Sequence, residues 1–260
     1  MTLPLRIATS ALWRRATVHR YGEHPRQLAD LHRPAGAGPH PVAVVLHGGA
    51  WQPPWTKLVM RPLCFDLVRR GWAAWNVEYR RVGRDGGGWP QTFDDVAAAI
   101  DRLAELADPA LDLDRVMLLG HSAGAQLALW AGGRADLPAG APGSEPRVRS
   151  RRVLALAAVC DLVRAGRPAR ELLGGSVDEV PERYAQADPM RRLPLRVPVG
   201  LVHPRADETV PVHDSRDYAA AARAAGGDVT LVEPPGGHRD PIDPSSAAWR
   251  AAVGWLSRPV

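Results

Sequence analysis

Six short apolar runs, separated by segments with helical character, most strongly limit how this chain of 260 residues can fold. Each run is continuous rather than alternating, which is typical of a strand buried on both faces of a parallel sheet. The runs are 41–46, 72–77, 115–119, 153–159, 197–202 and 229–232. The segments with helical character are 58–70, 91–107, 123–131, 212–225 and 247–256. This order predicts an α/β fold, with a mainly parallel sheet covered by helices on both faces.

Two earlier segments, 15–20 and 26–32, are separated by a turn and predict an antiparallel pair of strands at the sheet edge. The length and the 45% hydrophobic content suit one substantial core, so we predict a single domain over 1–260. The connection 161–196 is longer than a crossover between parallel strands requires. It includes a predicted short helix at 181–187 and is our candidate for a small lid.

Charge and cysteine content limit the class of partner and the compartment. The chain has a net charge of +5, but its basic residues are scattered among 28 acidic ones, so we expect no nucleic-acid partner. The two cysteines, Cys64 and Cys160, form no Cys-x-x-Cys pair, which argues against a disulfide framework or a thiolate metal site. Segment 1–16 is too interrupted for a signal peptide, and no stretch is long and apolar enough for a membrane span. We therefore expect a cytoplasmic protein with no membrane partner.

A Gly-x-Ser-x-Gly motif at 120–124 connects one predicted strand to the helix that follows it. In this context Ser122 is expected on a sharp turn, with Gly120 and Gly124 leaving room for the backbones packed against it. The motif also occurs in ordinary glycine-rich turns, but the flanking strand and helix favour a nucleophile. We predict that Ser122 is the nucleophile of a serine hydrolase.

Serine needs a base to accept its proton, and an acid to orient that base. Of the three histidines after Ser122, only His238 lies in a loop beyond the last predicted strand, where such sheets carry their chemistry. His203 lies in or at the end of a strand and His213 opens a helix, so we interpret both as structural or surface residues. His238 is therefore the predicted general base.

The acid is expected in the loop after the strand that precedes the last one. Asp207 occupies that loop, and we predict that it orients His238. Its neighbour Glu208 is interpreted as a solvated charge, and Asp161, after another strand, as a cap or turn residue.

The sequence His-Gly-Gly-Ala-Trp at 47–51 directly follows the first predicted strand of the parallel sheet. Attack on a carbonyl creates an oxyanion, which backbone N–H groups must stabilise. We predict that the amides of Gly49 and Ala50 do so together with that of Ala123. The alternative is a simple glycine turn, with His47 bracing the loop.

Three tryptophans, Trp51, Trp55 and Trp89, lie in or near loops at the expected mouth of the site. They are candidates to contact an acyl or aryl group, with core packing as the alternative. The sequence has no phosphate-binding glycine loop followed by Lys and no His/Asp cluster with metal-ligand spacing. We expect neither a metal nor another cofactor.

These motifs together resemble the esterase and lipase branch of the α/β-hydrolases, especially the group with a His-Gly-Gly-x-Trp loop. That group includes kynurenine formamidases and bacterial carboxylesterases. Besides the loop and the serine motif, the matching residues are 76–81, 94–96, 207–211, His238 and 243–244. The resemblance implies an α/β-hydrolase fold and a two-step acyl transfer, in which Ser122 is acylated and water activated by His238 then frees the acid.

Two positions depart from related patterns. Ala50 stands where hormone-sensitive lipases have a third glycine, and Arg239 stands where this group often has Phe after the catalytic histidine. The first departure, with the lack of a long N-terminal cap, argues against a lipase that acts at interfaces.

Three functions are compatible with these residues. The first is a serine carboxylic-ester hydrolase for small or medium acyl groups, with a small-molecule ester or amide as its partner. The second is an arylformamidase resembling kynurenine formamidase. The third is a non-catalytic binding module on the same fold, which the retention of Ser122, His238 and Asp207 disfavours.

Overall fold

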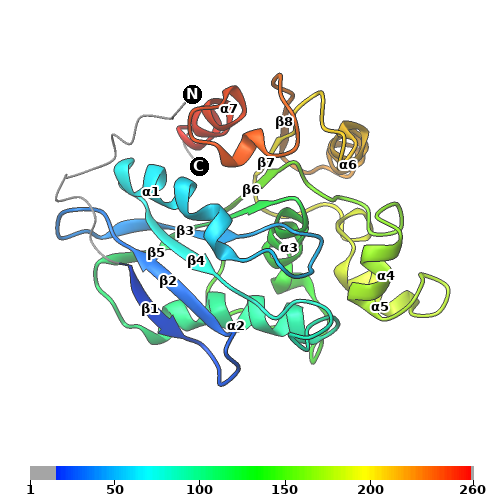
Figure 1. Cartoon of the computed structure of the whole chain (residues 1–260), viewed down its shortest axis with the longest axis horizontal. Helices are drawn as coiled ribbons and strands as arrows, with labels where there is room; N and C mark the ends of the chain where they lie inside the picture. The colour runs from blue at the N-terminus through cyan, green and yellow to red at the C-terminus, as the bar shows by residue number, and fades with distance from the viewer. Residues whose placement is uncertain (1–15, 259–260) are drawn as a thin grey trace.

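The computed structural model describes residues 16–258, which form one eight-stranded sheet flanked by helices (Figure 1). The sheet order is β1-β2-β4-β3-β5-β6-β7-β8. Strand β2 pairs antiparallel with β1 and β4, whereas the other neighbours are parallel. The strands are β1 (Thr17–Arg20), β2 (Leu28–His32), β3 (His40–Leu46), β4 (Ala73–Val77), β5 (Leu111–His121), β6 (Arg152–Leu156), β7 (Val199–Val202) and β8 (Val229–Val232). The predicted mainly parallel sheet and its antiparallel edge pair are both confirmed.

Strands β5 and β6 differ most from their predicted bounds. Strand β5 begins at Leu111 rather than 115, because Asp112 and Asp114 interrupt the apolar run there without ending the strand. Strand β6 ends at Leu156 rather than 159, since Ala157 has a φ of 46°, which extended backbone does not allow. The predictions made on residues 1–15, including the absence of a signal peptide, lie outside the described residues.

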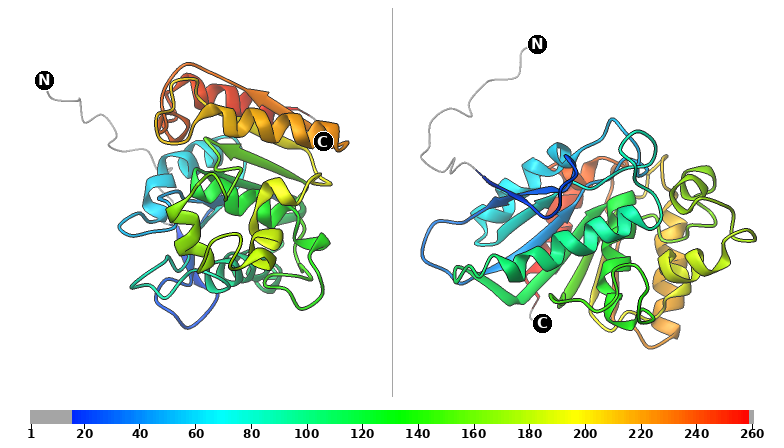
Figure 2. Two further views of the ribbon diagram at one scale, coloured as in Figure 1. Left: turned by 90° about the vertical axis from the view of Figure 1, so that its right-hand side faces the viewer. Right: turned by 90° about the horizontal axis from the view of Figure 1, so that it is seen from below.

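Helices cover both faces of the sheet, and α7 and α2 lie on opposite sides of it (Figures 1 and 2). Alternate side chains of β3 show why: Val42, Val44 and Leu46 belong to one hydrophobic core, and Ala43 and Val45 to the other. One core is completed by η1 (Lys57–Met60), α1 (Arg61–Arg69) and α7 (Ala247–Leu256). The other is completed by α2 (Gln91–Glu105), α3 (Ala123–Gly132) and α6 (Val212–Ala224). All five predicted helical segments, four between strands and one after the last strand, are confirmed.

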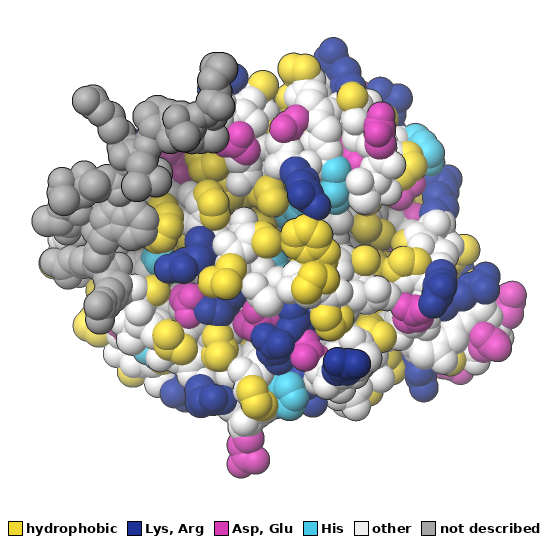
Figure 3. Space-filling model, viewed as in Figure 1, with side chains coloured by type: hydrophobic (Ala, Val, Ile, Leu, Met, Phe, Trp, Pro, Cys, Tyr) yellow, Lys and Arg dark blue, Asp and Glu magenta, His cyan; other side chains and the backbone are white. Residues whose placement is uncertain are grey.

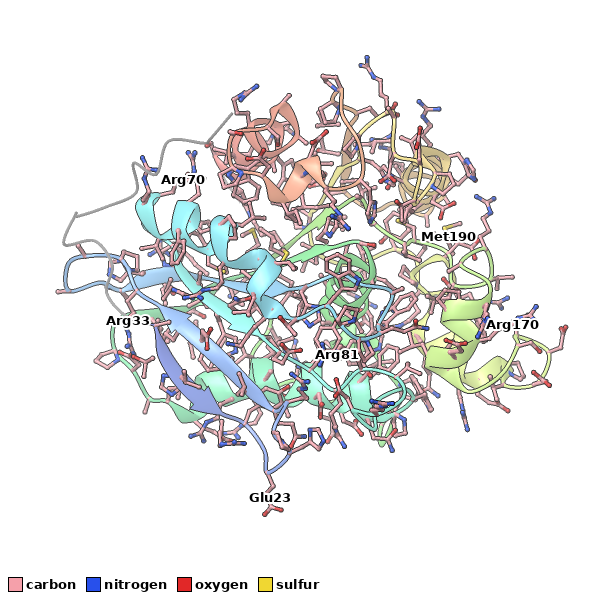
Figure 4. The ribbon with its side chains drawn as sticks, in the orientation of Figure 1. Glu23, Arg33, Arg70, Arg81, Arg170 and Met190 are labelled. Atoms are coloured by element: carbon pink, nitrogen blue, oxygen red, sulfur yellow. The ribbon has the colours of Figure 1, made fainter. Side chains whose placement is uncertain are left out.

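The long connection 161–196 contains α4 (Arg167–Leu173), α5 (Pro181–Ala187) and η3 (Pro189–Arg191). Figure 4 places Arg170 at the margin of the molecule. Helix α5 has its predicted bounds, whereas α4 was not predicted, because a proline in its first turn reads as a loop signal although it suits a helix start. The connection is attached to the core, since the side chain of Gln126 on α3 donates a hydrogen bond to the carbonyl of Ala187 at 2.9 Å. Its role as a lid stays a prediction.

The surface carries both signs of charge. On the face seen in Figure 3, Lys and Arg side chains are interspersed with Asp and Glu. Two further short 3-10 turns, η2 (Arg134–Asp136) and η4 (Asp240–Ile242), lie in loops. Within residues 16–258, no helix has the length and apolar content needed to span a membrane.

Candidate active site

Ser122 lies at the sharp turn between β5 and α3. Its backbone has φ 55° and ψ −121°, a region that residues other than glycine rarely adopt, and its amide donates to the carbonyl of Leu156 at 2.8 Å. A Cβ on Gly120 would collide with the carbonyl of Gly124, and one on Gly124 would collide with that of Leu46. The two glycines are therefore required for the close approach of helix and strands at this turn.

His238 and Asp207 are hydrogen-bonded to each other, although they lie in different loops. The Nδ1 of His238 is 2.7 Å from the Oδ2 of Asp207. The other oxygen, Oδ1, accepts the amides of Thr209 and Val210, each at 2.9 Å. Because Nδ1 donates its proton to the carboxylate, Nε2 of a neutral His238 keeps the lone pair that a general base needs.

A second histidine contacts the same carboxylate. The Nε2 of His203 lies 3.2 Å from Asp207 Oδ2 and donates to the carbonyl of Val210 at 2.9 Å, while its Nδ1 accepts from the hydroxyl of Ser215 at 2.7 Å. Burial by itself raises the pKa of Asp207, but the hydrogen bonds from His203, His238 and the Val210 amide outweigh it. They hold the pKa of Asp207 well below its usual value, so the carboxylate stays ionised.

The alternative residues considered for base and acid lie elsewhere. His213 is exposed and lies 3.5 Å from Asp214, and Glu208 is exposed. Asp161 accepts the amides of Val163 and Arg164, which makes it a turn residue, as predicted. His203 is fully buried, which agrees with its interpretation as a structural residue, and its contact with Asp207 was not predicted.

The loop after β3 has an unusual backbone at three consecutive residues. Gly49, Ala50 and Trp51 have φ values of 116°, 51° and 58°. Among residues 16–258, no acceptor receives the amides of Gly49 and Ala50, which leaves both free for a ligand. The amide of Ala123, in the first turn of α3, has no intrahelical acceptor either.

Buried side chains hold this loop in place. The hydroxyl of Tyr79 donates to the carbonyl of His47 at 2.7 Å, and the two rings are stacked with their centroids 4.3 Å apart. The indole of Trp51 donates to Gln126 of α3 at 3.1 Å, which ties the loop to the helix that begins after Ser122. The loop is therefore a glycine turn braced by His47, as the alternative interpretation held. The same turn also presents the free amides of Gly49 and Ala50.

The loop and the two catalytic candidates surround one cavity of about 460 Å³. Its lining comprises Gly48, Gly49, Ala50, Gln52, Pro53, Trp55, Val59, His121, Ser122, Thr209, His238, Arg239 and Ile242. The structure thus brings together Ser122, His238 and the free amides, with Asp207 behind His238. This arrangement can attack a carbonyl, take up the proton and stabilise the oxyanion.

Of the three tryptophans expected at the mouth, only Trp55 lines this cavity, and it is 38% exposed. Trp51 is 1% exposed, because its indole is bonded to Gln126 within the core. The ring of Trp89 packs edge-on against Phe93, and its amide donates to Leu172 of α4 at 2.7 Å. Of these three candidates to contact an acyl or aryl group, the structure therefore supports Trp55, whereas core packing describes Trp51 and Trp89.

His121, between Gly120 and Ser122, is a residue whose role the sequence did not indicate. Its Nε2 donates to the backbone carbonyl of His238 at 2.8 Å, and the two rings lie 4.8 Å apart. Burial, and next the nearby charge of His238, lower the pKa of His121 to about 4, so it is neutral near pH 7. Its position inside the motif was visible, but its partner is 117 residues away.

No group of three or more His, Cys, Asp or Glu side chains suited to hold a metal ion occurs in the part of the chain that the structure describes.

Comparison with known families and curated proteins gives consistent matches. The profile of the BD-FAE family matches residues 29–221. Two esterases of Mycobacterium tuberculosis are similar in sequence. Esterase LipC is 28% identical over 254 residues, with 88% of this chain and 61% of LipC covered. Esterase LipQ is 30% identical over 235 residues, with 84% of this chain and 55% of LipQ covered. The chain therefore spans between about half and three fifths of these relatives.

Two solved structures resemble the whole described fold. The esterase Est2 of the planctomycete Thermogutta terrifontis, with butyrate bound, has a TM-score of 0.75 at 23% identity, covering 93% of this chain and 91% of that one. A truncated carbohydrate esterase from gut microbiota has a TM-score of 0.79 at 19% identity, covering 93% and 95%. At these identities the likeness shows the fold, and the predicted fold class is confirmed.

Proposed function

The chain belongs to the BD-FAE family, within the esterase branch of the α/β-hydrolases, and from this we propose that it is a serine hydrolase of carboxylic esters. Its substrates are small-molecule esters of small or medium acyl groups, and the reaction passes through an acyl-enzyme. The observation that carries the proposal is the single cavity lined by Ser122, His238 and the loop of free amides.

In the first step, Nε2 of His238 takes the proton of Ser122 while the hydroxyl oxygen attacks the ester carbonyl. Asp207 stays ionised, holds the Nδ1–H tautomer and stabilises the imidazolium that forms. The imidazolium then gives its proton to the departing alcohol, and the acyl group remains on Ser122. In the second step, His238 activates water by the same proton transfer, and the acid is released.

The oxyanion of each tetrahedral intermediate is stabilised by the amides of Gly49, Ala50 and Ala123. Two observations support this part of the proposal. The first two amides have no acceptor within residues 16–258, and the third begins a helix, where the helix dipole favours negative charge.

A cytoplasmic setting is part of the same proposal, and it rests on Cys64 and Cys160, both of which are buried as free thiols.

The test is hydrolysis of p-nitrophenyl esters from acetate to decanoate, beside N-formylkynurenine, by wild type and Ser122→Ala. We expect cleavage that is highest on short esters, and a loss of about a thousandfold or more in kcat in the variant. Ser144→Ala, in a loop outside the cavity, is the matched control and retains wild-type turnover. A serine-directed phosphonate labels wild type but not Ser122→Ala.

The alternatives give distinct results in this experiment. A much larger kcat/KM on N-formylkynurenine would replace the esterase with an arylformamidase. If neither substrate class reacts and the phosphonate fails to label Ser122, the non-catalytic binding module becomes the better description. Full turnover by Ser122→Ala would reject Ser122 as the nucleophile.

A further inference from the structure

The cavity beside Ser122 has an uneven charge. Among its lining residues, Arg239 alone carries a permanent charge at neutral pH, and no Asp, Glu or Lys belongs to the lining in the described part of the chain. Two carboxylates lie just outside the lining: Asp207 is fully buried behind His238, and Glu171 accepts a hydrogen bond from the side chain of Gln52. The lining itself therefore carries one permanent cation and no carboxylate.

The guanidinium of Arg239 lies over the ring of Trp55, with its central carbon 4.9 Å from the ring centroid. Arg239 follows the proposed base, whereas Trp55 follows the oxyanion loop, so this contact connects the two loops on either side of the cavity. No carboxylate among residues 16–258 lies within 4 Å of the Arg239 guanidinium nitrogens. A guanidinium that stacks through its face keeps its N–H edge available to an anion.

Trp55 is held in position by the residues beneath it. Arg81, labelled in Figure 4, has a side chain that is 1% exposed, pairs with Asp85 at 2.5 Å and donates to the carbonyl of Trp55. The tryptophan side chain also fills the space beside Gly49, where a Cβ would collide with it. The ring is therefore a fixed platform that orients the otherwise exposed guanidinium of Arg239.

We propose that Arg239, stacked on Trp55, forms a subsite for a carboxylate of the substrate. The preferred substrates are then monoesters that carry a free carboxylate a few bonds from the scissile ester, because the subsite and Ser122 belong to one cavity. The two N–H groups at the edge of the guanidinium bind the carboxylate in a bidentate manner. This inference rests on the proposed function and narrows its substrate class.

The test compares charged and neutral esters of similar shape. Monoethyl succinate and ethyl levulinate place a carboxylate or a methyl ketone on the acyl side. Butyryloxyacetate and butyryloxyacetamide place a carboxylate or an amide on the alcohol side. We expect wild type to favour the charged member of at least one pair by about fivefold or more in kcat/KM, mostly through KM.

Variants then assign the preference to Arg239. Arg239→Gln brings that ratio close to one, because it lowers kcat/KM on the charged ester more than on its neutral partner, whereas Arg239→Lys retains part of the preference. Arg69→Gln removes the same charge from an exposed site at the end of α1 and keeps the wild-type ratio. About 0.5 M salt lowers the preference of wild type, since it screens an exposed ion pair.

The outcomes separate this inference from the proposed function. If wild type hydrolyses the neutral esters without preferring either charged partner, or if Arg239→Gln keeps the preference, the carboxylate subsite is rejected and the esterase remains. If wild type hydrolyses none of the four esters or the p-nitrophenyl series, the proposed function itself fails, and the inference that rests on it fails too.

Discussion

At the scale of single residues, the carboxylate of Asp207 is the best-supported group of the candidate site. Two backbone amides bind one of its oxygens, and two histidines lie within 3.2 Å of the other. Four donors around a side chain with no exposed surface fix its position and its charge. Because these contacts hold the pKa of Asp207 well below its usual value, loss of activity on mild acidification comes from other groups.

The substitution Asp207→Asn tests this assignment. The amide has nearly the same shape, but its nitrogen facing His238 would favour the tautomer with the proton on Nε2, which cannot accept the proton of Ser122. We expect kcat on a short ester to fall by about a thousandfold or more, while circular dichroism stays unchanged. Glu208→Gln, at the exposed neighbouring carboxyl, is the control and keeps wild-type kcat. A folded Asp207→Asn variant with kcat within tenfold of wild type would contradict the role of Asp207.

The sequence indicated some of these residues and not others, for a physical reason. The Gly-x-Ser-x-Gly motif selected Ser122. Chain order and loop position selected Asp207 and His238, because the carboxyl ends of parallel strands meet at one edge of the sheet. The contacts of His203 and His121 arise from packing between loops far apart in sequence. No periodicity or spacing reports a partner of that kind, and the same is true of the burial of Trp51.

At the scale of elements, the oxyanion loop is the most constrained segment near the cavity. Its three successive residues with positive φ are held by Tyr79 beneath the loop and by Gln126 on α3. Backbone strain of this kind persists only where the surroundings determine it, and it is common at functional sites. The loop therefore depends on neighbours that take no part in the reaction.

Gly49→Ala tests whether this loop geometry is needed for turnover. The new methyl group would collide with the side chain of Trp55, at a residue whose φ of 116° already disfavours a side chain. We expect the Gly49 and Ala50 amides to shift and kcat to fall by about a hundredfold, with a smaller change in KM. Gly226→Ala is the matched control, because Gly226 has a φ of 87° and open space around it. Equal kcat in both variants would show that the loop does not act in the transition state.

Element prediction succeeded where the local signal and the packing agree. Strand β8 and helices α5 and α7 have their predicted bounds, because each is a regular segment between clear turn residues. Helix α4 was missed, since seven residues with an early proline carry little periodicity. Strand β5 was predicted too short, since a register shift in its pairing with β3 lets it continue through the polar residues Asp112 and Asp114.

At the scale of the whole molecule, the described residues form one sheet with a hydrophobic core on each face, as continuous apolar strands predict. The single domain over 1–260 stays a prediction.

Titratable groups buried at the carboxyl ends of the strands make the free energy of unfolding depend on pH. His121 is among them, since it is neutral and buried in the folded protein.

Stability is expected to depend on pH through His121. Its pKa is about 4 in the folded protein and about 6.5 in an unfolded chain, so the unfolded state binds more protons between these values. The free energy of unfolding therefore decreases as pH falls, and His121 accounts for about 2 kcal/mol of the loss between pH 7 and pH 5. Urea denaturation of wild type and His121→Gln at both pH values measures it. The other titrating groups act in both proteins, so an equal decrease in the two would refute the prediction.

The contact of Arg239 with Trp55 has a consequence for how proteins of this family can diverge. Ser122 and Asp207 are buried, His238 is hydrogen-bonded to Asp207, and the proposed oxyanion donors belong to the backbone. Arg239 and Trp55 at the cavity are instead two exposed side chains that belong to neither hydrophobic core. Selection can therefore exchange the residue after the base, and with it the range of accepted esters, while the inherited catalytic apparatus and the stability of the fold stay unchanged.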